Sequence, residues 1–270
     1  MGMEIADNLN QVGHRIWELD FLRGFCVFLM IFDHFMYDLG FIFGDIWYGV
    51  SFVPFDSLSW LCSWAGEVYW DSLGRQIIRS LVVLSFIGLS GLSCSFSHSN
   101  YQRGCKLALL ALLLTFGTYL FDMVSGGSGD YIIRFGILHL LAFSILLYAL
   151  LASVKPFWLI IIGSIFIVGG FLLDLWSWQP EHNYLAFLGL RNGDYLSADY
   201  FPIFPWTGYF LLGAVLGSGL YRQRRSYFPH LQGRICQKPF LLLGRQALLA
   251  YLLHQPLVYI FLLLIGSVFR

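Results

Sequence analysis

The first apolar segment of the chain carries ionisable side chains at spacings that place them on one face of a helix. At ~100° per residue, and with Arg23 as the reference, His34 lies about 20° from it. Asp20 and Asp38 both lie about 60° from the same reference, whereas Asp33 lies about 80° away on the opposite side. An ionisable group at membrane depth costs about 3 kcal/mol on insertion scales, so this polar stripe is expected to be functional.

The spacing of His34 and Asp38 is that of a general base and the carboxylate that orients it. The two residues are one helical turn apart, which lets a carboxylate reach an imidazole. A neutral imidazole held in this way is a competent base near neutral pH. We therefore predict that His34 and Asp38 are catalytic, with Arg23 about 16 Å from His34 along the helix axis. The alternative is a polar stripe that only fastens helices together.

Two further histidines lie within apolar segments. His139 follows the sequence Phe-Gly-Ile-Leu, and His254 precedes Gln-Pro, where Pro256 frees a backbone carbonyl and opens the helix locally. We expect both histidines, together with Asp174, to bind the substrate. The alternative for either histidine is a structural hydrogen bond.

Basic residues provide candidates for contacts with the phosphates of a cofactor. These candidates are Arg23, Arg103, Lys106, Arg222 and Arg245. Arg23 and Arg245 fall inside predicted spans, where the usual excess of cytoplasmic positive charge does not explain them. The five cysteines form neither a C-x-x-C pair nor a Cys/His set at zinc spacing, so we expect no metal site.

These side chains need a scaffold within the bilayer, and the composition indicates one. Of the 270 residues, 58% are hydrophobic and only 12% are charged, whereas soluble domains carry about a quarter charged residues. Seven apolar segments are predicted to span a membrane: 21–43, 76–96, 106–122, 135–154, 157–175, 204–221 and 240–268. The sequence thus predicts an all-α integral membrane protein with a single domain over 1–270. This composition, with a formal net charge of zero, excludes nucleic-acid binding.

Two longer stretches separate the predicted spans. The aromatic-rich stretch 46–72 is expected to form a loop with interfacial or re-entrant pieces, and the polar stretch 176–203 a second long loop. Basic residues concentrate in the segments before the first span and after the second, fourth and sixth spans, which all fall on one side. Because cytoplasmic segments are enriched in Lys and Arg, we expect a cytoplasmic N-terminus and a C-terminus outside.

The order of several motifs resembles the transmembrane acyltransferase superfamily. Leu-Asp-Phe-Leu-Arg-Gly followed by His34 is similar to its opening helix, and the acyltransferase-3 branch has an Arg, ten residues and a His in that place. Four later motifs resemble the branch with the catalytic domain of heparan-α-glucosaminide N-acetyltransferase. They are Phe86-Ile-Gly-Leu-Ser-Gly-Leu-Ser, Arg134-Phe-Gly-Ile-Leu-His139, Asp199-Tyr-Phe-Pro-Ile-Phe-Pro-Trp-Thr-Gly-Tyr-Phe-Leu-Leu-Gly213 and Leu243-Gly-Arg-Gln-Ala-Leu-Leu-Ala-Tyr-Leu-Leu-His-Gln-Pro256.

This resemblance, which extends from about Arg15 to Phe261, implies acyl transfer across a membrane. The family takes an acetyl group from acetyl-CoA in the cytoplasm and delivers it to a sugar amine or hydroxyl on the far side. By analogy, Arg23 and the other basic residues would bind the CoA phosphates, and His34 would act at the acyl group. Expected partners are acyl-CoA, a sugar-like acceptor and the lipid bilayer, and a homodimer is left open. The expected location is the bacterial cytoplasmic (inner) membrane.

Two points remain open at the level of the sequence. Nothing separates His34 as a general base from His34 as an acyl carrier. A proton-coupled transporter would also use intramembrane His, Asp and Arg side chains, although the chain lacks the internal repeat that many transporters show. Another alternative is a catalytically inactive scaffold, which would bind CoA poorly or not at all.

Overall fold

A computed structural model describes residues 16–49, 56–176, 178 and 180–269. Over these residues the chain is helical, and the only strand-like pairing is an isolated bridge between Phe135 and Tyr200. The predicted all-α membrane class is therefore confirmed. The chain divides into two compact units, one of Met1–Phe86 with Arg224–Arg270 and one of Ile87–Gln223.

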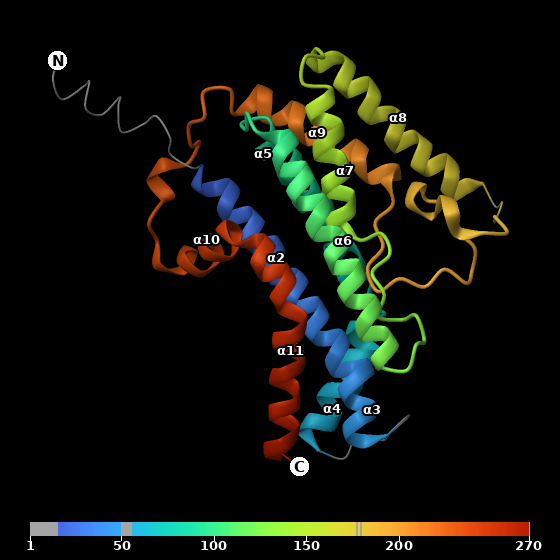
Figure 1. Cartoon of the computed structure of the whole chain (residues 1–270). Coiled ribbons are helices and arrows are strands. Elements are labelled where there is room, and N and C mark those ends of the chain that lie inside the picture. Colours follow the sequence, from blue (N-terminus) through green and yellow to red (C-terminus); the bar gives the residue numbers. More distant parts are fainter. Residues whose placement is uncertain (1–15, 50–55, 177, 179, 270) are drawn as a thin grey trace. The chain divides into compact units, whose positions relative to one another are not determined.

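The first unit contains helices from both ends of the chain (Figure 1). These are α2 (Trp17–Tyr37), α3 (Gly44–Tyr48), α4 (Ser57–Ser63), the first part of α5 (Leu73–Cys94), α10 (Lys238–Arg245) and α11 (Ala247–Phe269). Two π-helical segments, Asp38–Phe43 and Trp64–Tyr69, follow α2 and α4, and short 3₁₀ turns lie at Pro229–Leu231 and Ile235–Gln237. The stretch expected to form a loop with interfacial pieces thus holds short helices over its described part.

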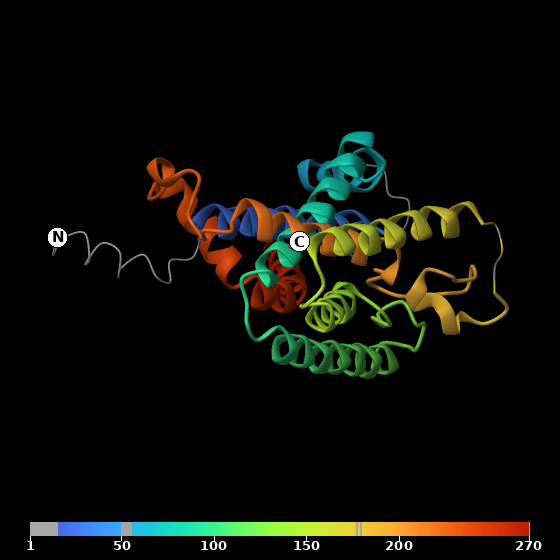
Figure 2. The same ribbon diagram turned by 90° about the horizontal axis from the view of Figure 1, so that it is seen from above.

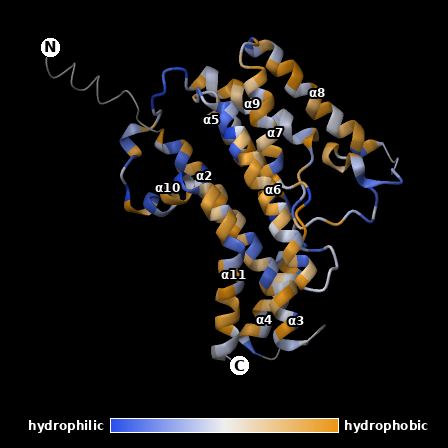
Figure 3. Ribbon diagram, viewed as in Figure 1, coloured by the Kyte–Doolittle hydropathy of each residue, from blue (hydrophilic) through white to orange (hydrophobic). Residues whose placement is uncertain are grey.

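The second unit contains the end of α5 and four further helices. These are α6 (Asn100–Val124), α7 (Ile137–Leu150), α8 (Pro156–Leu175) and α9 (Ile203–Leu220), with a 3₁₀ segment at Asn183–Leu188. In both ribbon views α6 and α7 run side by side (Figures 1 and 2). Hydrophobic residues dominate α8 (Figure 3).

Six helical stretches in the described part of the chain are long and apolar enough to cross a membrane. They are Trp17–Tyr48, Leu73–Cys94, Asn100–Val124, Pro156–Leu175, Ile203–Leu220 and Ala247–Ser267. The first is 32 residues long because α2 continues through the π-helical segment into α3. Six of the seven predicted segments correspond to these stretches.

Two predicted segments differ from the structure. The segment 135–154 forms only the 14-residue helix α7, which falls short of the ~20 residues that usually span a bilayer. The segment 240–268 is not one helix, because the backbone at Gln246 leaves helical geometry and separates α10 from α11. Arg245 therefore ends a short helix instead of lying inside a span.

Helix α10 packs directly on the backbone of α2. A Cβ atom at Gly24 would collide with the carbonyl oxygen of Phe240, and one at Gly244 would collide with that of Asp20. The Phe240 ring packs edge-on against aromatic rings of α2, including that of Phe21 at 5.4 Å between centroids. These two glycines let α10 approach α2 closely enough to cover its N-terminal half.

In the second unit, glycines also allow close packing of the helices. A side chain at Gly208 of α9 would meet the carbonyl oxygen of Gly163 in α8. The Ser144 and Thr207 hydroxyls, 3.1 Å apart, join α7 to α9 in a fully buried contact. Buried Asp122, near the end of α6, accepts hydrogen bonds from the backbone N–H groups of Gly129 and Tyr131 and so orders the loop before α7.

Candidate active site

The polar stripe of α2 faces two different helices along its length. Near its N-terminal end lie Asp20 and Arg23, beside α10, and near its C-terminal end lie His34 and Asp38, beside α11. The His34 ring packs against the ring of His254 from α11, with centroids 4.9 Å apart and planes at 71°. The structure therefore brings together two of the histidines that the sequence singled out.

Both rings are fixed in the same tautomer by backbone carbonyls. The Nδ1 atom of His34 lies 2.8 Å from the carbonyl oxygen of Met30, and that of His254 lies 2.6 Å from the carbonyl oxygen of Tyr251. A carbonyl oxygen only accepts hydrogen bonds, so each Nδ1 is the donor. In the neutral rings the lone pair is then on Nε2, which makes Nε2 the basic atom of both side chains.

Asp38 is not the hydrogen-bond partner of His34. Its fully buried carboxylate accepts hydrogen bonds from the Gln255 amide, whose Nε2 lies 2.9 Å from each carboxylate oxygen. The predicted contact of the Asp38 carboxylate with the His34 imidazole is therefore wrong, because Nδ1 of His34 bonds to the Met30 carbonyl and the carboxylate bonds to Gln255. The helical turn between the two residues is regular, since the backbone N–H of Asp38 donates to the carbonyl oxygen of His34, so it is the partners of the side chains that keep them apart. A catalytic role for Asp38 stays a prediction.

Two buried polar atoms at this site have no hydrogen-bond partner in the described structure. They are Nε2 of His254 and Oε1 of Gln255. An unsatisfied buried polar group costs roughly 1–3 kcal/mol, which makes such atoms candidates for contact with a bound molecule. Both belong to the sequence just before Pro256, which lies inside α11.

Asp33 lies on the other side of α2, as its helical phase predicts, and has its own partners. Arg75 of α5 contacts it at two points, with Nε 2.7 Å from Oδ1 and Nη2 3.0 Å from Oδ2. The Tyr69 hydroxyl donates to Oδ1 at 3.0 Å, and the Arg75 guanidinium stacks on the Trp70 ring at 3.4 Å. This network fixes the residue next to His34 in the chain.

At the other end of the stripe, one carboxylate holds two guanidinium groups. Arg23 Nη1 lies 3.2 Å from Oδ1 of Asp20, and Arg245 Nε lies 3.7 Å from Oδ2. The Arg245 side chain is 52% exposed, whereas the Asp20 side chain is only 11% exposed. Two guanidinium groups thus lie beside one carboxylate, and guanidinium groups pair well with phosphate oxygens.

The remaining predicted site residues belong to the second unit. Both ring nitrogens of His139 are engaged: Gly136 N–H donates to Nδ1 at 3.3 Å, and Nε2 lies 3.1 Å from the Thr115 hydroxyl. Asp174 is exposed in the last turn of α8. Arg103, Lys106 and Arg222 are also exposed, the first two at the start of α6 and the third just after α9. Their roles stay predictions.

The comparison with protein families identifies the chain. The family model described as heparan-alpha-glucosaminide N-acetyltransferase, catalytic, matches residues 15–55 and 55–256. The chain belongs to this family. Comparison with curated proteins and with solved structures gave no match.

Membership of the heparan-α-glucosaminide N-acetyltransferase catalytic family indicates a membrane acetyltransferase. It gives no support to the transporter alternative, and the match does not extend to the acyltransferase-3 family. The matched region contains both histidines of the candidate site and both partners of Asp33.

Three residues that complete the site were not singled out from the sequence. Gln255 lies directly after His254, so its position in the His-Gln-Pro motif was a usable signal. The signal for Arg75 and Tyr69 was weaker. Asp33 lies off the polar stripe, and a carboxylate within a span needs polar partners from another segment. Among the described residues, no group of three His, Cys, Asp or Glu side chains is placed to hold a metal ion.

Proposed function

We propose that the protein transfers an acetyl group from acetyl-CoA to an amine or hydroxyl of a sugar-like acceptor, with His34 as the catalytic base. The observation that carries this proposal is the paired arrangement of His34 and His254, each with Nδ1 bonded to a carbonyl and Nε2 as the basic atom. A ring held in one tautomer offers the same nitrogen to every substrate molecule, which is what proton transfer requires.

The proposed reaction needs one proton acceptor and one leaving group. Nε2 of His34 takes the proton from the acceptor's N–H or O–H as that atom attacks the thioester carbonyl. The C–S bond then breaks, and the CoA thiolate leaves and takes up the proton from the imidazolium. His254, whose Nε2 is buried, unpartnered and carries the lone pair, accepts a hydrogen bond from an N–H or O–H group of the acceptor in this arrangement.

The N-terminal end of the stripe suits the phosphates of CoA. Arg23 and Arg245 both contact Asp20, so two guanidinium groups, which pair well with phosphate oxygens, lie together at this end of the stripe. About 16 Å of helix separates Arg23 from His34, a span that an extended pantetheine arm can cover. The predicted orientation places this end of α2 at the cytoplasmic face of a bacterial inner membrane, on the side where acetyl-CoA is made.

The second candidate mechanism keeps the same site and changes only the role of His34. As an acyl carrier, Nε2 itself attacks the thioester and forms an acetyl-imidazole that the acceptor then cleaves. The same free Nε2 supports this route, and the two mechanisms differ in whether an acetylated protein accumulates without acceptor.

Full-length protein in sealed proteoliposomes tests the proposal. With radiolabelled acetyl-CoA on one side and glucosamine on the other, we expect labelled N-acetylglucosamine to appear on the acceptor side. His34→Gln should abolish it, and His98→Gln, a histidine outside the site, should not. Label on the protein in the absence of glucosamine would select the acyl-carrier route. Equal product from empty liposomes and from protein would contradict the proposal.

A further inference from the structure

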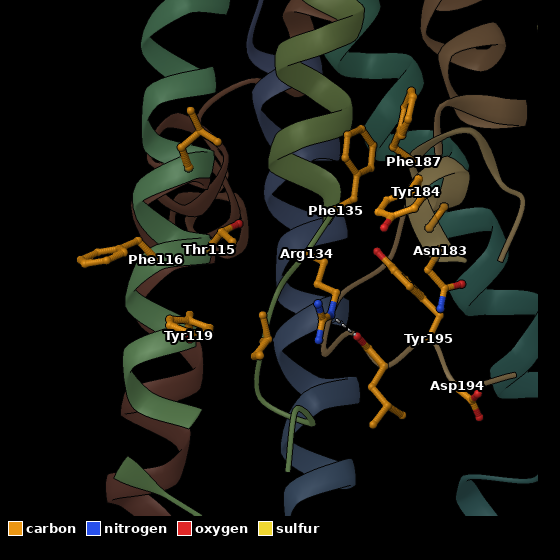
Figure 4. Close-up of a pocket in the computed structure, with 14 residues that line it drawn as sticks. Thr115, Phe116, Tyr119, Arg134, Phe135, Asn183, Tyr184, Phe187, Asp194 and Tyr195 are labelled. Carbon is orange, nitrogen blue, oxygen red and sulfur yellow. Dashed lines mark hydrogen bonds between the residues drawn. The ribbon is translucent and has the colours of Figure 1, made fainter. Parts of the chain in front are cut away.

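The second unit contains a pocket of about 720 Å³ that no part of the proposed reaction uses. It lies between one face of α6, the segment that precedes α7, and the loop after α8 (Figure 4). Its volume falls in the range of ordinary small-molecule sites. One wall of the pocket is apolar and the opposite wall is polar and aromatic, and this difference indicates the kind of ligand.

One wall is the apolar surface of a membrane-spanning helix. Leu112, Phe116 and Tyr119 recur at intervals of three or four residues along α6 and are 62%, 60% and 47% exposed. In the window that identifies α6 as a span, only 11% of the residues are buried inside the protein. A helix so little covered by protein presents this face to the hydrocarbon of the bilayer.

The opposite wall is polar and aromatic. It includes Arg134 and Asp194, together with Asn183, Tyr184 and Tyr195 (Figure 4). Arg134 lies in the segment between α6 and α7, and the two tyrosines lie in the loop after α8. Arginine and tyrosine at the ends of spans favour the depth of the lipid head groups.

Arg134 and Asp194 have charges that the described protein does not neutralise. Arg134 uses Nε to donate to the carbonyl oxygen of Leu196 at 2.9 Å, and the ion pairs of the described residues do not include it. Asp194 is likewise exposed and outside those pairs. The pocket therefore offers one cation and one anion beside an apolar groove.

We infer that this pocket binds a phospholipid whose head group carries both a phosphate and a primary ammonium, as phosphatidylethanolamine does. The phosphate contacts the free guanidinium N–H groups of Arg134, which match phosphate oxygens in geometry. The ammonium donates to Asp194, and an acyl chain lies along Leu112 and Phe116. This inference does not depend on the acetyl transfer proposed above.

Binding to the purified full-length chain can be followed by native mass spectrometry with three lipids that differ only in the head group. Phosphatidylethanolamine supplies both charges, phosphatidylglycerol lacks the ammonium, and phosphatidylcholine has an ammonium that cannot donate hydrogen bonds. We expect the ethanolamine lipid to bind most tightly. Arg134→Gln should weaken its binding about fivefold or more, and Arg134→Lys, which keeps the charge but not the paired donors, should weaken it less.

The matched variants separate the two charges. Asp194→Asn should lower the affinity for phosphatidylethanolamine to that for phosphatidylglycerol and leave the latter unchanged. In the parent, the Arg191 guanidinium stacks on Tyr200 outside the pocket. The control variant Arg191→Gln should therefore bind all three lipids as the parent does. Equal binding of the three lipids by the parent, or unchanged binding by Arg134→Gln, would overturn the inference. Displacement of the lipid by equimolar soluble phosphoethanolamine would also overturn it, because the acyl chain would then contribute nothing.

Discussion

The contact of Asp33 with Arg75 predicts a specific loss of stability when Arg75 is changed to Gln. The Arg75 side chain is 9% exposed and that of Asp33 18%, so the pair is largely shielded from water. Removing one partner of a buried pair costs about 3–5 kcal/mol. The Tyr69 hydroxyl remains on the carboxylate and Gln supplies one donor, so we expect about 2–3 kcal/mol here.

Thermal unfolding in detergent or nanodiscs measures this loss. At 2–4 °C per kcal/mol for a chain of this size, Arg75→Gln should lower Tm by roughly 5–10 °C. Arg79→Gln is the matched control, since Arg79 lies one turn further along α5 and is exposed, and it should shift Tm by no more than about 2 °C. The double variant Asp33→Asn/Arg75→Gln should lose less than the sum of the two single changes.

The reasoning is refuted if Arg75→Gln and Arg79→Gln lower Tm equally, or if the two single losses add in the double variant. Either result would mean that the bidentate contact contributes no more than an exposed ion pair does.

Three further outcomes are expected. Arg23→Ala should weaken acetyl-CoA binding by about tenfold or more in equilibrium dialysis, and unchanged affinity in the folded variant would restrict Arg23 to fastening helices through Asp20. Gly244→Ala should lower Tm, because overpacking costs about 1–3 kcal/mol. The control Gly74→Ala has open space around its Cβ position and should be neutral or stabilising. The reverse order of the two Tm values would contradict the close packing of α10 on α2. Burial, followed by the charge of Asp33, raises the pKa of Tyr69 to about 12. The stability that this neutral phenol contributes is complete below pH ~10 and is lost as the pH rises through about 12. When Tm is measured against pH, Tyr69→Phe should not show this loss at alkaline pH. The same dependence of Tm on pH in the parent and the variant would exclude Tyr69 as the source of the loss.

Much of the fold follows from the sequence because membrane spans are defined by length and composition. The two departures, α7 and the break at Gln246, both depend on contacts that hydropathy does not encode. The helix α10 ends next to the close contact of Gly244 with α2, and a continuous apolar pattern from 240 to 268 gives no sign of either feature.

Helical phase predicted which side of α2 each polar residue faces, but it could not predict which groups those residues bond to. The phase correctly separated Asp33 from the stripe of His34. Helical phase did not predict the partners of His34 and Asp38, because the imidazole bonds to the Met30 carbonyl and the carboxylate accepts from Gln255 of α11. The pairing of His34 with His254 also lies beyond the sequence, since it depends on how α11 crosses α2.

The most direct test of the central claim is the turnover of His34→Ala beside that of His139→Ala, each with acetyl-CoA affinity measured on the same preparation. General-base assistance contributes about 10²–10⁴-fold, so His34→Ala should lose at least a hundredfold in acetyl transfer and bind acetyl-CoA as the parent does. His139→Ala should retain far more of the activity, because both ring nitrogens of His139 are already bonded within the second unit. A folded His34→Ala protein that binds acetyl-CoA and transfers acetyl groups at a near-native rate would contradict the account.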